Sequence, residues 1–305
     1  MSEANGAKDW TLGGILDVTA GFLKKKNPES PPRLDAELLL SKVLGIPRVG
    51  LYINFDRVLN EEEVSGYREL VRRRGRHEPV AYILGEKEFY KLPLKADPRA
   101  LIPRPDTEHL VDEALRILRA VPAQDPATAG RRPAVADLGC GSGAIALAIA
   151  KEYPLALVEA SDISKDALSL AKENALALGL QDKVAFHEGD LFQAPFENAR
   201  FDLICANLPY VPSGLLPTLP PDVAGFEPWG ALDGGPDGMG LTGRLLKESQ
   251  DRLHPGGHIL LEIDPSQLGP LSELASSLGL LPQEPIRDYS KRERVFSAKS
   301  PGPGE

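Results

Sequence analysis

The sequence predicts an α/β protein in which a parallel, doubly wound sheet follows a small helical domain. Three observations carry this prediction. The length of 305 residues corresponds to about two domains. Residues 10–78 place apolar residues at helical spacing. From residue 133 onward, short apolar segments alternate with amphipathic ones, which is the pattern of β-α-β units.

Two N-terminal segments have clear helix boundaries, so we expect a helical domain over residues 1–80. One segment follows Pro31 and Pro32 and ends at Gly45. The other spans residues 61–74, with three glutamates in its first turn and three arginines in its last, as the helix dipole favours. A basic cluster ends this helix and is either a solvated helix end or a docking patch for an acidic protein: Arg72, Arg73, Arg74, Arg76 and His77.

The rest of the chain divides into a linker, residues 81–105, and a sheet domain, residues 106–305. Aromatic and apolar residues lie among Gly and Pro in the linker, which predicts a β-hairpin or an extended segment. Asp106 is expected to cap a helix that runs to about Arg119, and residues 121–133 are expected to form a loop. Strands are predicted at 133–138, 155–161, 183–189, 201–207 and 256–263, and helices at 143–151, 164–178, 241–252 and 266–278. Two terminal β segments, 281–287 and 294–298, are close enough to add an antiparallel edge.

Composition excludes several classes of protein. Acidic residues number 44 and basic residues 35, so the net charge of −9 argues against a broad nucleic-acid-binding surface. Cys140 and Cys205 belong to no CxxC or Cys/His cluster, so we expect no metal site and no disulfide. The first residues lack a signal-peptide pattern, and no run of about 18 apolar residues predicts a membrane span. We therefore expect a cytoplasmic protein without membrane contact.

A glycine-rich loop after the first predicted strand is the main candidate for a ligand site. It carries three glycines, which allow a sharp turn and a close approach to a ligand: Gly139, Gly141 and Gly143. Asp162 ends the next strand, where a carboxylate can accept hydrogen bonds from ribose hydroxyls. Asp190 and Leu191 follow the third strand and can meet an adenine. The alternatives are a purely structural turn for the glycines and an ordinary loop position for Asp190.

Two details favour a cationic nucleoside over a dinucleotide. The spacing is G-x-G-x-G rather than G-x-G-x-x-G. Asp137 precedes the loop, where its carboxylate would repel a pyrophosphate and attract the ammonium and sulfonium groups of S-adenosylmethionine. The order D-L-G-x-G-x-G, an acid after strand two and Asp-Leu after strand three resembles the S-adenosylmethionine-dependent methyltransferases of the seven-stranded Rossmann-like class. The resemblance implies that fold and that cofactor.

The fourth strand ends in a motif, Asn-Leu-Pro-Tyr, that supplies the predicted catalytic residues. The Asn207 side-chain oxygen and the Leu208 backbone carbonyl can each accept one N–H of a planar NH2 group and aim its lone pair at a methyl donor. Pro209 stiffens the turn, and Tyr210 can pack on the flat target. Glutamine amides, adenine N6 and cytosine N4 all fit. Glutamine and DNA methyltransferases usually have Pro at the position of Leu208, whereas the rRNA adenine dimethylases have Leu there. The motif therefore does not decide which of these NH2 groups is the substrate.

Sequence blocks outside the cofactor core narrow the choice of substrate. The chain is similar to the HemK/PrmC family from about residue 10 to 298, in PRLDAELLLSKVLG, HEPVAYILGEKEFY, LIPRPDTEHLVDEAL, FEPWGALDGGPDGMG and GGHILLEI. The resemblance implies a glutamine N5-methyltransferase acting on the Gly-Gly-Gln loop of class I peptide chain release factors, with the helical domain recognising the substrate. We expect a monomer. The expected cofactor contacts are Asp137, Gly139, Cys140, Gly141, Ser142, Gly143, Asp162, Asp190, Leu191 and Asn207, with the adenine on Leu191 or Phe192.

Other interpretations stay open. An adenine-N6 or other nucleic-acid amine methyltransferase fits the Leu208 variant of the motif, and a non-catalytic cofactor-binding adaptor is a third possibility. Arg104 is expected to pair with a ligand carboxyl group or with a local acid, or else to join an ion-paired helix cap around Asp106 and Glu108. Glu227 and Asp233 flank a glycine-rich loop that either closes over the substrate or is an ordinary surface loop.

Overall fold

A computed structural model describes residues 10–120, 131–193, 196 and 199–302. The described chain forms two compact units. The helical unit comprises residues 10–85 together with Pro220–Phe226, and the sheet unit comprises Glu86–Leu219 and residues 227–302. The predicted loop at 121–133 lies mostly outside the described residues.

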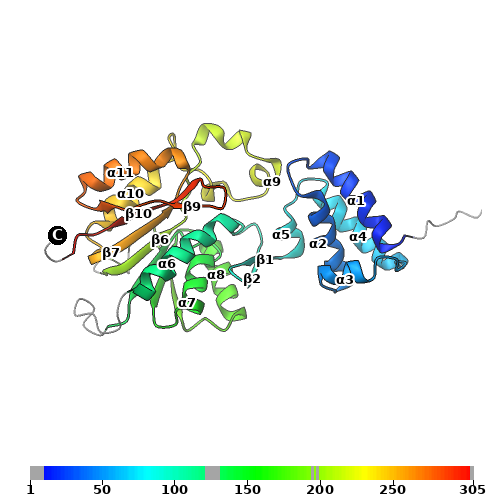
Figure 1. The fold of residues 1–305 in the computed structure, drawn as a ribbon, viewed down its shortest axis with the longest axis horizontal. Coiled ribbons are helices and arrows are strands. Elements are labelled where there is room, and N and C mark those ends of the chain that lie inside the picture. The colour runs from blue at the N-terminus through cyan, green and yellow to red at the C-terminus, as the bar shows by residue number, and fades with distance from the viewer. Residues whose placement is uncertain (1–9, 121–130, 194–195, 197–198, 303–305) are drawn as a thin grey trace, which may run out of the picture. The chain divides into compact units, whose positions relative to one another are not determined.

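The helical unit is held together by an apolar core of leucines around Tyr67. Its helices are α1 (Leu12–Lys26), α2 (Pro32–Leu44), α3 (Arg48–Ile53), α4 (Glu61–Arg74) and α5 (Val80–Leu84) (Figure 1). Leu12, Leu16, Leu39 and Tyr67 are all at most 1% exposed, and the Tyr67 hydroxyl donates to the Ala36 carbonyl. The α4 helix begins at an Asn60 capping box, which satisfies backbone N–H groups at its first turn.

The basic cluster at the end of α4 is largely paired inside this unit. Arg74 is buried, and its Nε donates to the Asp35 carboxylate at 2.8 Å. Arg73 forms an ion pair with Glu78, and exposed Arg72 forms one with Glu69. Arg74 is therefore a structural residue, because a guanidinium leaves water only when its charge and donors are matched.

The sheet unit contains a two-stranded hairpin and one eight-stranded sheet. The hairpin pairs β1 (Glu86–Phe89) with β2 (Leu92–Lys95). The large sheet has the order β5-β4-β3-β6-β7-β10-β8, with β9 paired to β10. Neighbours from β5 to β7 are parallel, and β10 is antiparallel to β7, β8 and β9. The strands are β3 (Ala134–Leu138), β4 (Leu157–Asp162), β5 (Val184–Glu188), β6 (Phe201–Ala206), β7 (Leu253–Glu262), β8 (Leu281–Pro282), β9 (Ile286–Arg287) and β10 (Glu293–Lys299).

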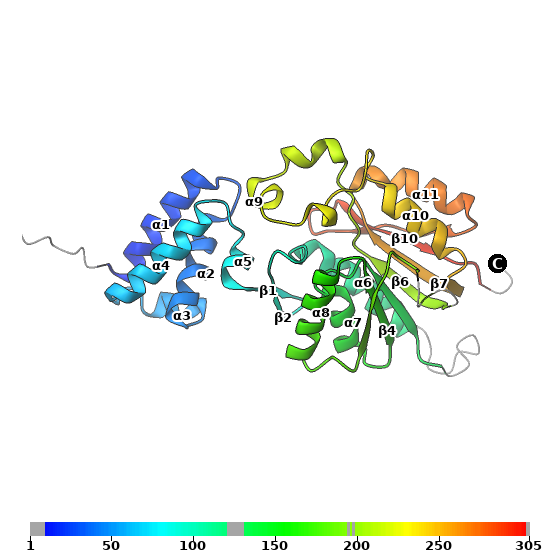
Figure 2. The same ribbon diagram turned by 180° about the vertical axis from the view of Figure 1, so that it is seen from behind.

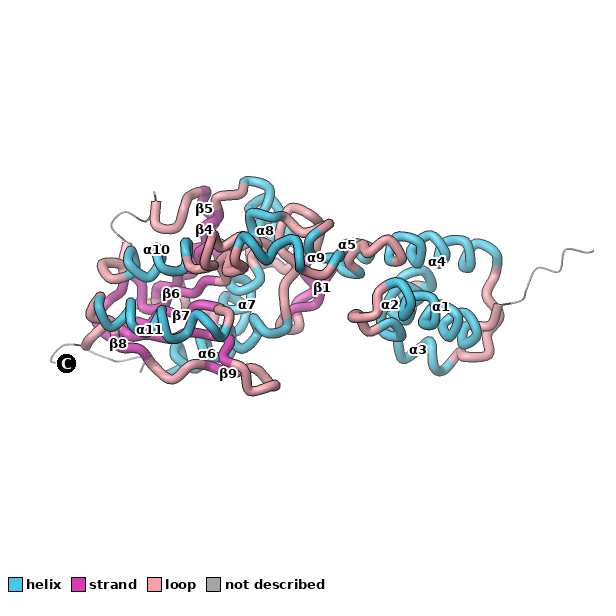
Figure 3. Tube along the Cα trace, turned by 90° about the horizontal axis from the view of Figure 1, so that it is seen from above, coloured by secondary structure: helices cyan, strands magenta, loops and turns pink. Residues whose placement is uncertain are grey.

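Helices cover both faces of this sheet, as the predicted doubly wound fold requires (Figures 1 and 2). One face carries α6 (Glu108–Ala120), α7 (Ala144–Glu152) and α8 (Lys165–Ala177). The other carries α10 (Gly240–Ser249) and α11 (Leu268–Ser277), which lie in front of β6 and β7 in Figure 3. Short turns complete the unit: η1 (Pro105–Thr107), η2 (Ser213–Thr218), η3 (Trp229–Ala231) and η4 (Pro265–Gln267), while α9 (Pro221–Ala224) belongs to the helical unit.

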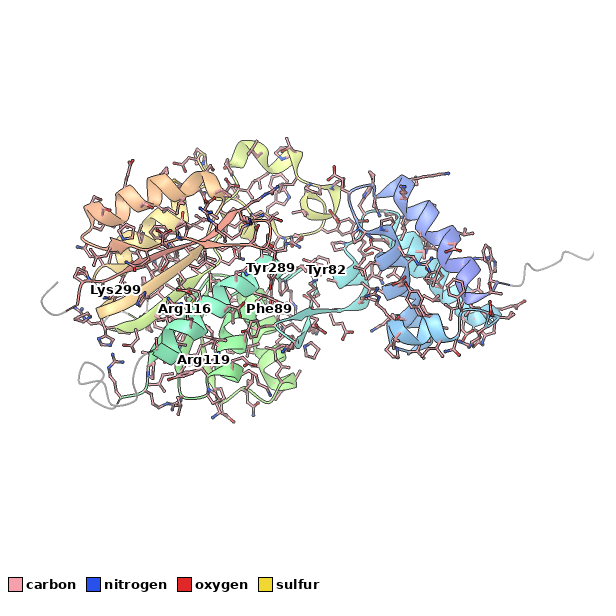
Figure 4. The ribbon with its side chains drawn as sticks, in the orientation of Figure 1. Tyr82, Phe89, Arg116, Arg119, Tyr289 and Lys299 are labelled. Carbon is pink, nitrogen blue, oxygen red and sulfur yellow. The ribbon has the colours of Figure 1, made fainter. Side chains whose placement is uncertain are left out.

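The α6 helix shows how the amphipathic pattern produces this layering. Leu110, Val111 and Leu118 face the core and are at most 1% exposed. Arg116 and Arg119 lie on the outer side of the same helix, where their side chains are more than half exposed (Figure 4). One apolar stripe therefore binds the helix to the sheet and leaves charged residues in water.

One expectation about local structure is wrong, and one is confirmed. Asp106 does not cap the helix, because it lies inside the η1 turn and its carboxylate approaches Arg294 at 3.3 Å instead. The terminal β segments form the expected antiparallel edge, because β8 and β9 both pair antiparallel with β10. The β10 strand lies between β7 and β8, and its residues Val295, Phe296 and Ala298 are apolar and nearly unexposed, as a strand covered on both faces requires.

Candidate functional site

A cavity of about 360 Å³ lies at the carboxyl ends of the parallel strands of the sheet unit. Ligand sites of open parallel sheets occur at this edge, and the volume is in the range of small-molecule sites. The predicted site residues that line it are Gly139, Gly141, Asp162, Asp190, Leu191, Asn207, Leu208 and Pro209. Residues that sequence reasoning did not single out complete the wall, among them Arg99, Leu241 and Arg244.

The glycine loop passes directly under the Asn-Leu-Pro-Tyr motif. The N–H groups of Gly139 and Cys140 both donate to the Ser161 carbonyl, at 2.8 and 2.9 Å, which ties the loop to β4. Gly139 has a φ of 72°, and a Cβ there would lie 2.6 Å from the Leu208 Cδ2. Only glycine fits, because the position requires both a left-handed backbone and close contact with Leu208.

Asp162 connects the loop to the cavity. Its two carboxylate oxygens accept from the N–H groups of Gly141 and Ser164, both at 2.8 Å. Burial raises the pKa of this carboxyl, and the two backbone N–H groups oppose that effect. Since each carboxylate oxygen can accept more than one hydrogen bond, the group retains capacity for a pair of ribose hydroxyls.

Asp137 lies behind the loop and not on the cavity wall. It is fully buried, and one oxygen accepts from the Ala146 N–H at 3.0 Å. The other oxygen, Oδ1, is buried without a hydrogen-bond partner among the described residues. Burial raises the pKa of Asp137 to about 7. The chemistry of this site suits a cationic ligand, because the carboxyl groups of Asp137 and Asp162 both lie at the loop.

The remaining predicted contacts differ in position. Cys140 and Ser142 line a smaller recess of about 50 Å³ on the other side of the loop, together with Asn207. Gly143 is the N-cap residue of α7 and lies next to Ala171, and it lines neither the cavity nor the recess. Tyr210 also lies outside both linings. Cys140, Ser142, Gly143 and Tyr210 therefore lie near the cavity without lining it.

The turn after β5 presents Leu191, and not Phe192, to the cavity. Leu191 adopts a φ of 53°, which is unusual for a branched side chain, and the Ser161 hydroxyl donates to its carbonyl at 3.3 Å. Phe192 turns into the core, with its ring centroid 6.2 Å from that of Phe201. Asp190 is ion-paired with Arg244, so a ligand that contacts the Asp190 carboxylate also lies beside the Arg244 guanidinium.

Asn207 is the end of a buried hydrogen-bonded chain that the sequence did not reveal. Its Nδ2 donates to the Thr107 hydroxyl oxygen at 3.2 Å. The Thr107 hydroxyl donates to Glu262 Oε2 at 2.5 Å, and the Tyr210 hydroxyl donates to Glu262 Oε1 at 3.3 Å. Burial raises the pKa of Glu262. The sequence feature that could have indicated this chain of hydrogen bonds is Glu262, an acid within the otherwise apolar segment ILLEI.

The loop after the motif is anchored and packed closely. Glu227 is buried and accepts from the Ile102 N–H at 3.1 Å and from Arg104 at 2.5 Å. Arg104 thus pairs with Glu227 in this structure, and not with Asp106 or Glu108. Asp233 stays at the surface, where it accepts from the Ser213 hydroxyl.

The backbone of the motif is fixed by Gln267. Its Nε2 donates to the carbonyls of Tyr210 and Gly238, at 3.3 and 2.8 Å. A Cβ on Gly238 would lie 2.3 Å from the Tyr210 carbonyl oxygen, so the glycine-rich loop fits directly against the motif. Among the described residues, no group of His, Cys, Asp and Glu side chains could hold a metal ion, and no helix has the length and apolarity to cross a membrane.

Comparison with known proteins identifies the family. Residues 15–85 match the model of the PrmC N-terminal domain, and residues 135–219 match a methyltransferase domain model. A ribosomal protein L11 methylase from Lactobacillus delbrueckii subsp. bulgaricus is a distant structural neighbour, with 22% identity and a TM-score of 0.46 over 68% of this chain and 84% of that chain.

Two curated relatives align over nearly their whole length. The release factor glutamine methyltransferase of Rhodopirellula baltica is 43% identical over 97% of this chain and 99% of the relative. That of Geobacter sulfurreducens is 41% identical over 95% of this chain and 97% of the relative. At this identity and coverage the evolutionary relationship extends to both units, and the chain belongs to the release factor glutamine methyltransferase family.

Proposed function

We propose that this protein transfers the methyl group of S-adenosylmethionine to the side-chain amide nitrogen of a glutamine in a peptide chain release factor. One observation carries the proposal. Asn207, Leu208 and Pro209 line the same cavity as Gly139, Gly141 and Asp162, so an amide held by the motif would lie next to the cofactor. Membership of the release factor glutamine methyltransferase family supports the substrate class.

The cofactor would be held by the strand ends. Asp162 would accept hydrogen bonds from the ribose, Leu191 would pack on the adenine, and the glycine loop would follow the amino-acid part closely. Asp137, behind that loop, would contribute negative potential in its ionised form, without direct contact. When bound, S-adenosylmethionine supplies an electrophilic methyl group on its sulfonium.

The residues of this chain contribute alignment. The lone pair of an amide nitrogen is delocalised, so the nitrogen is a weak nucleophile. Hydrogen bonds from its NH2 group to the Asn207 side-chain oxygen and the Leu208 carbonyl would draw electron density onto the nitrogen and fix its direction of approach. Tyr210 is held by Glu262 at the end of the motif and lies outside the cavity lining, so it would support the motif itself and not the amide plane.

The finer assignments belong to the same proposal. We place the modified residue in the Gly-Gly-Gln motif of class I release factors, with N5-methylglutamine as the product. The helical unit would act as the substrate-recognition domain, the protein would act as a monomer, and it would work in the cytoplasm, where translation ends.

Mass spectrometry of the release factor after incubation with the protein and labelled S-adenosylmethionine tests the proposal. We expect one methyl group on the glutamine of the Gly-Gly-Gln peptide, and none on a release factor in which that glutamine is alanine. Label only in RNA or DNA would instead identify a nucleic-acid methyltransferase, and cofactor binding without transfer would identify an adaptor.

The variant Asn207→Ala tests the assigned role of the motif. We expect its turnover to fall by at least about a hundredfold, because the amide loses one of the two acceptors that orient it. Its unfolding midpoint should change little, since Asn207 lies at the cavity surface. Normal turnover by this variant would contradict the mechanism.

A further inference from the structure

We propose that Thr107 and Glu262 are positioning residues that set the orientation of the Asn207 amide, so that its oxygen faces the substrate and its nitrogen faces the protein. The inference rests on the proposed function, because it concerns how the acceptor for the substrate amide is prepared. Neither residue touches the substrate directly in this assignment. Thr107 lies in η1 and Glu262 at the end of β7, 155 positions later in the chain.

The first step of the argument is a count of protons. A threonine hydroxyl has one proton to donate, and an ionised carboxylate has none. Thr107 is 3% exposed and lies 2.5 Å from Glu262 Oε2, a separation typical of a hydroxyl donating to a carboxylate. The hydroxyl proton is therefore committed to Glu262.

The second step concerns Asn207. With its proton committed, the Thr107 oxygen can only accept a hydrogen bond. The amide group of Asn207 that approaches it at 3.2 Å must then be the NH2 group, as the structure has it. The amide oxygen consequently points away from Thr107, where it is available to accept a hydrogen bond from a substrate NH2 group.

The third step concerns protonation of Glu262. A neutral Glu262 can donate to Thr107, which frees the Thr107 hydroxyl to donate to the Asn207 oxygen and reverses the amide. Several groups face this carboxyl. Thr107 and Asp106 face it from η1, Tyr210 faces it from the motif after β6, and Arg294 faces it from β10. Its burial raises the pKa above the ordinary 4.5, and repulsion from Asp106 acts in the same direction, while Thr107, Tyr210 and Arg294 oppose them.

Glu262 also controls the other end of the motif. Its second oxygen accepts from the Tyr210 hydroxyl at 3.3 Å. One buried carboxylate thus orients both polar side chains of the Asn-Leu-Pro-Tyr motif, Asn207 through Thr107 and Tyr210 directly. These hydrogen bonds offset the cost of burying an acidic residue at a position that is only 3% exposed.

Kinetics of two Thr107 variants test the inference. Thr107→Val keeps the shape and removes the hydroxyl, so we expect kcat for release-factor methylation to fall by about tenfold or more, with unchanged affinity for S-adenosylmethionine. Thr107→Ser restores the hydroxyl and should stay within about threefold of the wild-type kcat. The matched control is Thr242→Val, another buried threonine of the sheet unit, whose hydroxyl donates to the Met239 carbonyl. Equal losses in all three variants would indicate packing effects and overturn the inference.

A second measurement needs no substrate. In full-length protein labelled with ¹⁵N-asparagine, the side-chain NH2 signal of Asn207 can be assigned from its absence in Asn207→Ala. We expect this signal to shift with pH around a midpoint above 4.5 and the shift to disappear in Glu262→Gln. The inference would be overturned if the Asn207 signal did not shift with pH in the wild type, or if it still shifted with pH in Glu262→Gln. If the wild type failed to methylate the release factor, the proposed function would fall while this measurement still decided the orientation.

Discussion

Burial of the Asp137 carboxyl predicts that the stability of the folded protein depends on pH. It is fully buried, one of its oxygens has no partner among the described residues, and its pKa is raised to about 7 from an ordinary 3.8. A carboxyl whose pKa is higher in the folded protein stabilises it fully below the unfolded pKa. That contribution is lost as pH rises through the folded pKa. Stability should therefore decline between about pH 4 and pH 7 on account of this residue.

The size of the effect follows from the two pKa values. At roughly 1.4 kcal/mol for each pKa unit, the difference between 3.8 and about 7 corresponds to about 4 kcal/mol, an order-of-magnitude figure for a fully buried group. Asp137→Asn removes the ionisation. Relative to the wild type, the variant should therefore gain stability as the pH rises from 4 to 8, so that its free energy of unfolding increases by an amount of this order.

Urea unfolding of the wild type and Asp137→Asn, measured across this pH range, is the appropriate assay. The other titrating groups cancel in the difference between the two proteins. Asp182→Asn, at an exposed position of the sheet unit, is the matched control for the loss of one carboxylate. If the difference between wild type and Asp137→Asn were the same at pH 4 and pH 8, the burial of an unpaired carboxyl would be refuted.

Two further predictions concern the glycine loop and the helical unit. Gly139→Ala places a side chain at positive φ and against a leucine, so we expect a loss of about 1–3 kcal/mol and weaker S-adenosylmethionine binding by calorimetry. Gly269→Ala, in α11 with open space around it, should cost nothing, and equal effects of the two would contradict the argument. Arg74→Met leaves a buried aspartate without its partner and should destabilise the helical unit by about 3–5 kcal/mol in denaturant unfolding. Arg72→Met, at an exposed ion pair, should leave the denaturant midpoint nearly unchanged, and a loss as large as that of Arg74→Met would argue against a special role for burial.

Local patterns allowed most elements of the fold to be predicted. Alternating apolar segments placed the strands, and Gly45 and the charged ends of residues 61–74 marked helix boundaries that recur in α2 and α4. These features act over a few residues, so they can be read without tertiary information. The prediction that failed, an Asp106 helix cap, depended on long-range packing, because the Asp106 carboxylate approaches Arg294 across the fold.

Contacts between distant parts of the chain were beyond sequence reasoning. Whether Leu191 or Phe192 meets the cavity depends on which side chain fits the aromatic core around Phe201. Arg74 looked like its solvated neighbours and proved to be buried against Asp35, which lies 39 positions earlier. Both outcomes are decided by the shape of a packed interior.

The sequence by itself determined the fold class, the family and the order in which the glycine loop, the acids and the Asn-Leu-Pro-Tyr motif follow successive strands, because each depends on short patterns and their spacing. Only the tertiary structure decided that Asp137 lies behind the loop and that Glu262 reaches Asn207 through Thr107. The physical reason is that hydrogen bonding and desolvation act through space, between residues that the chain brings together only when it has folded.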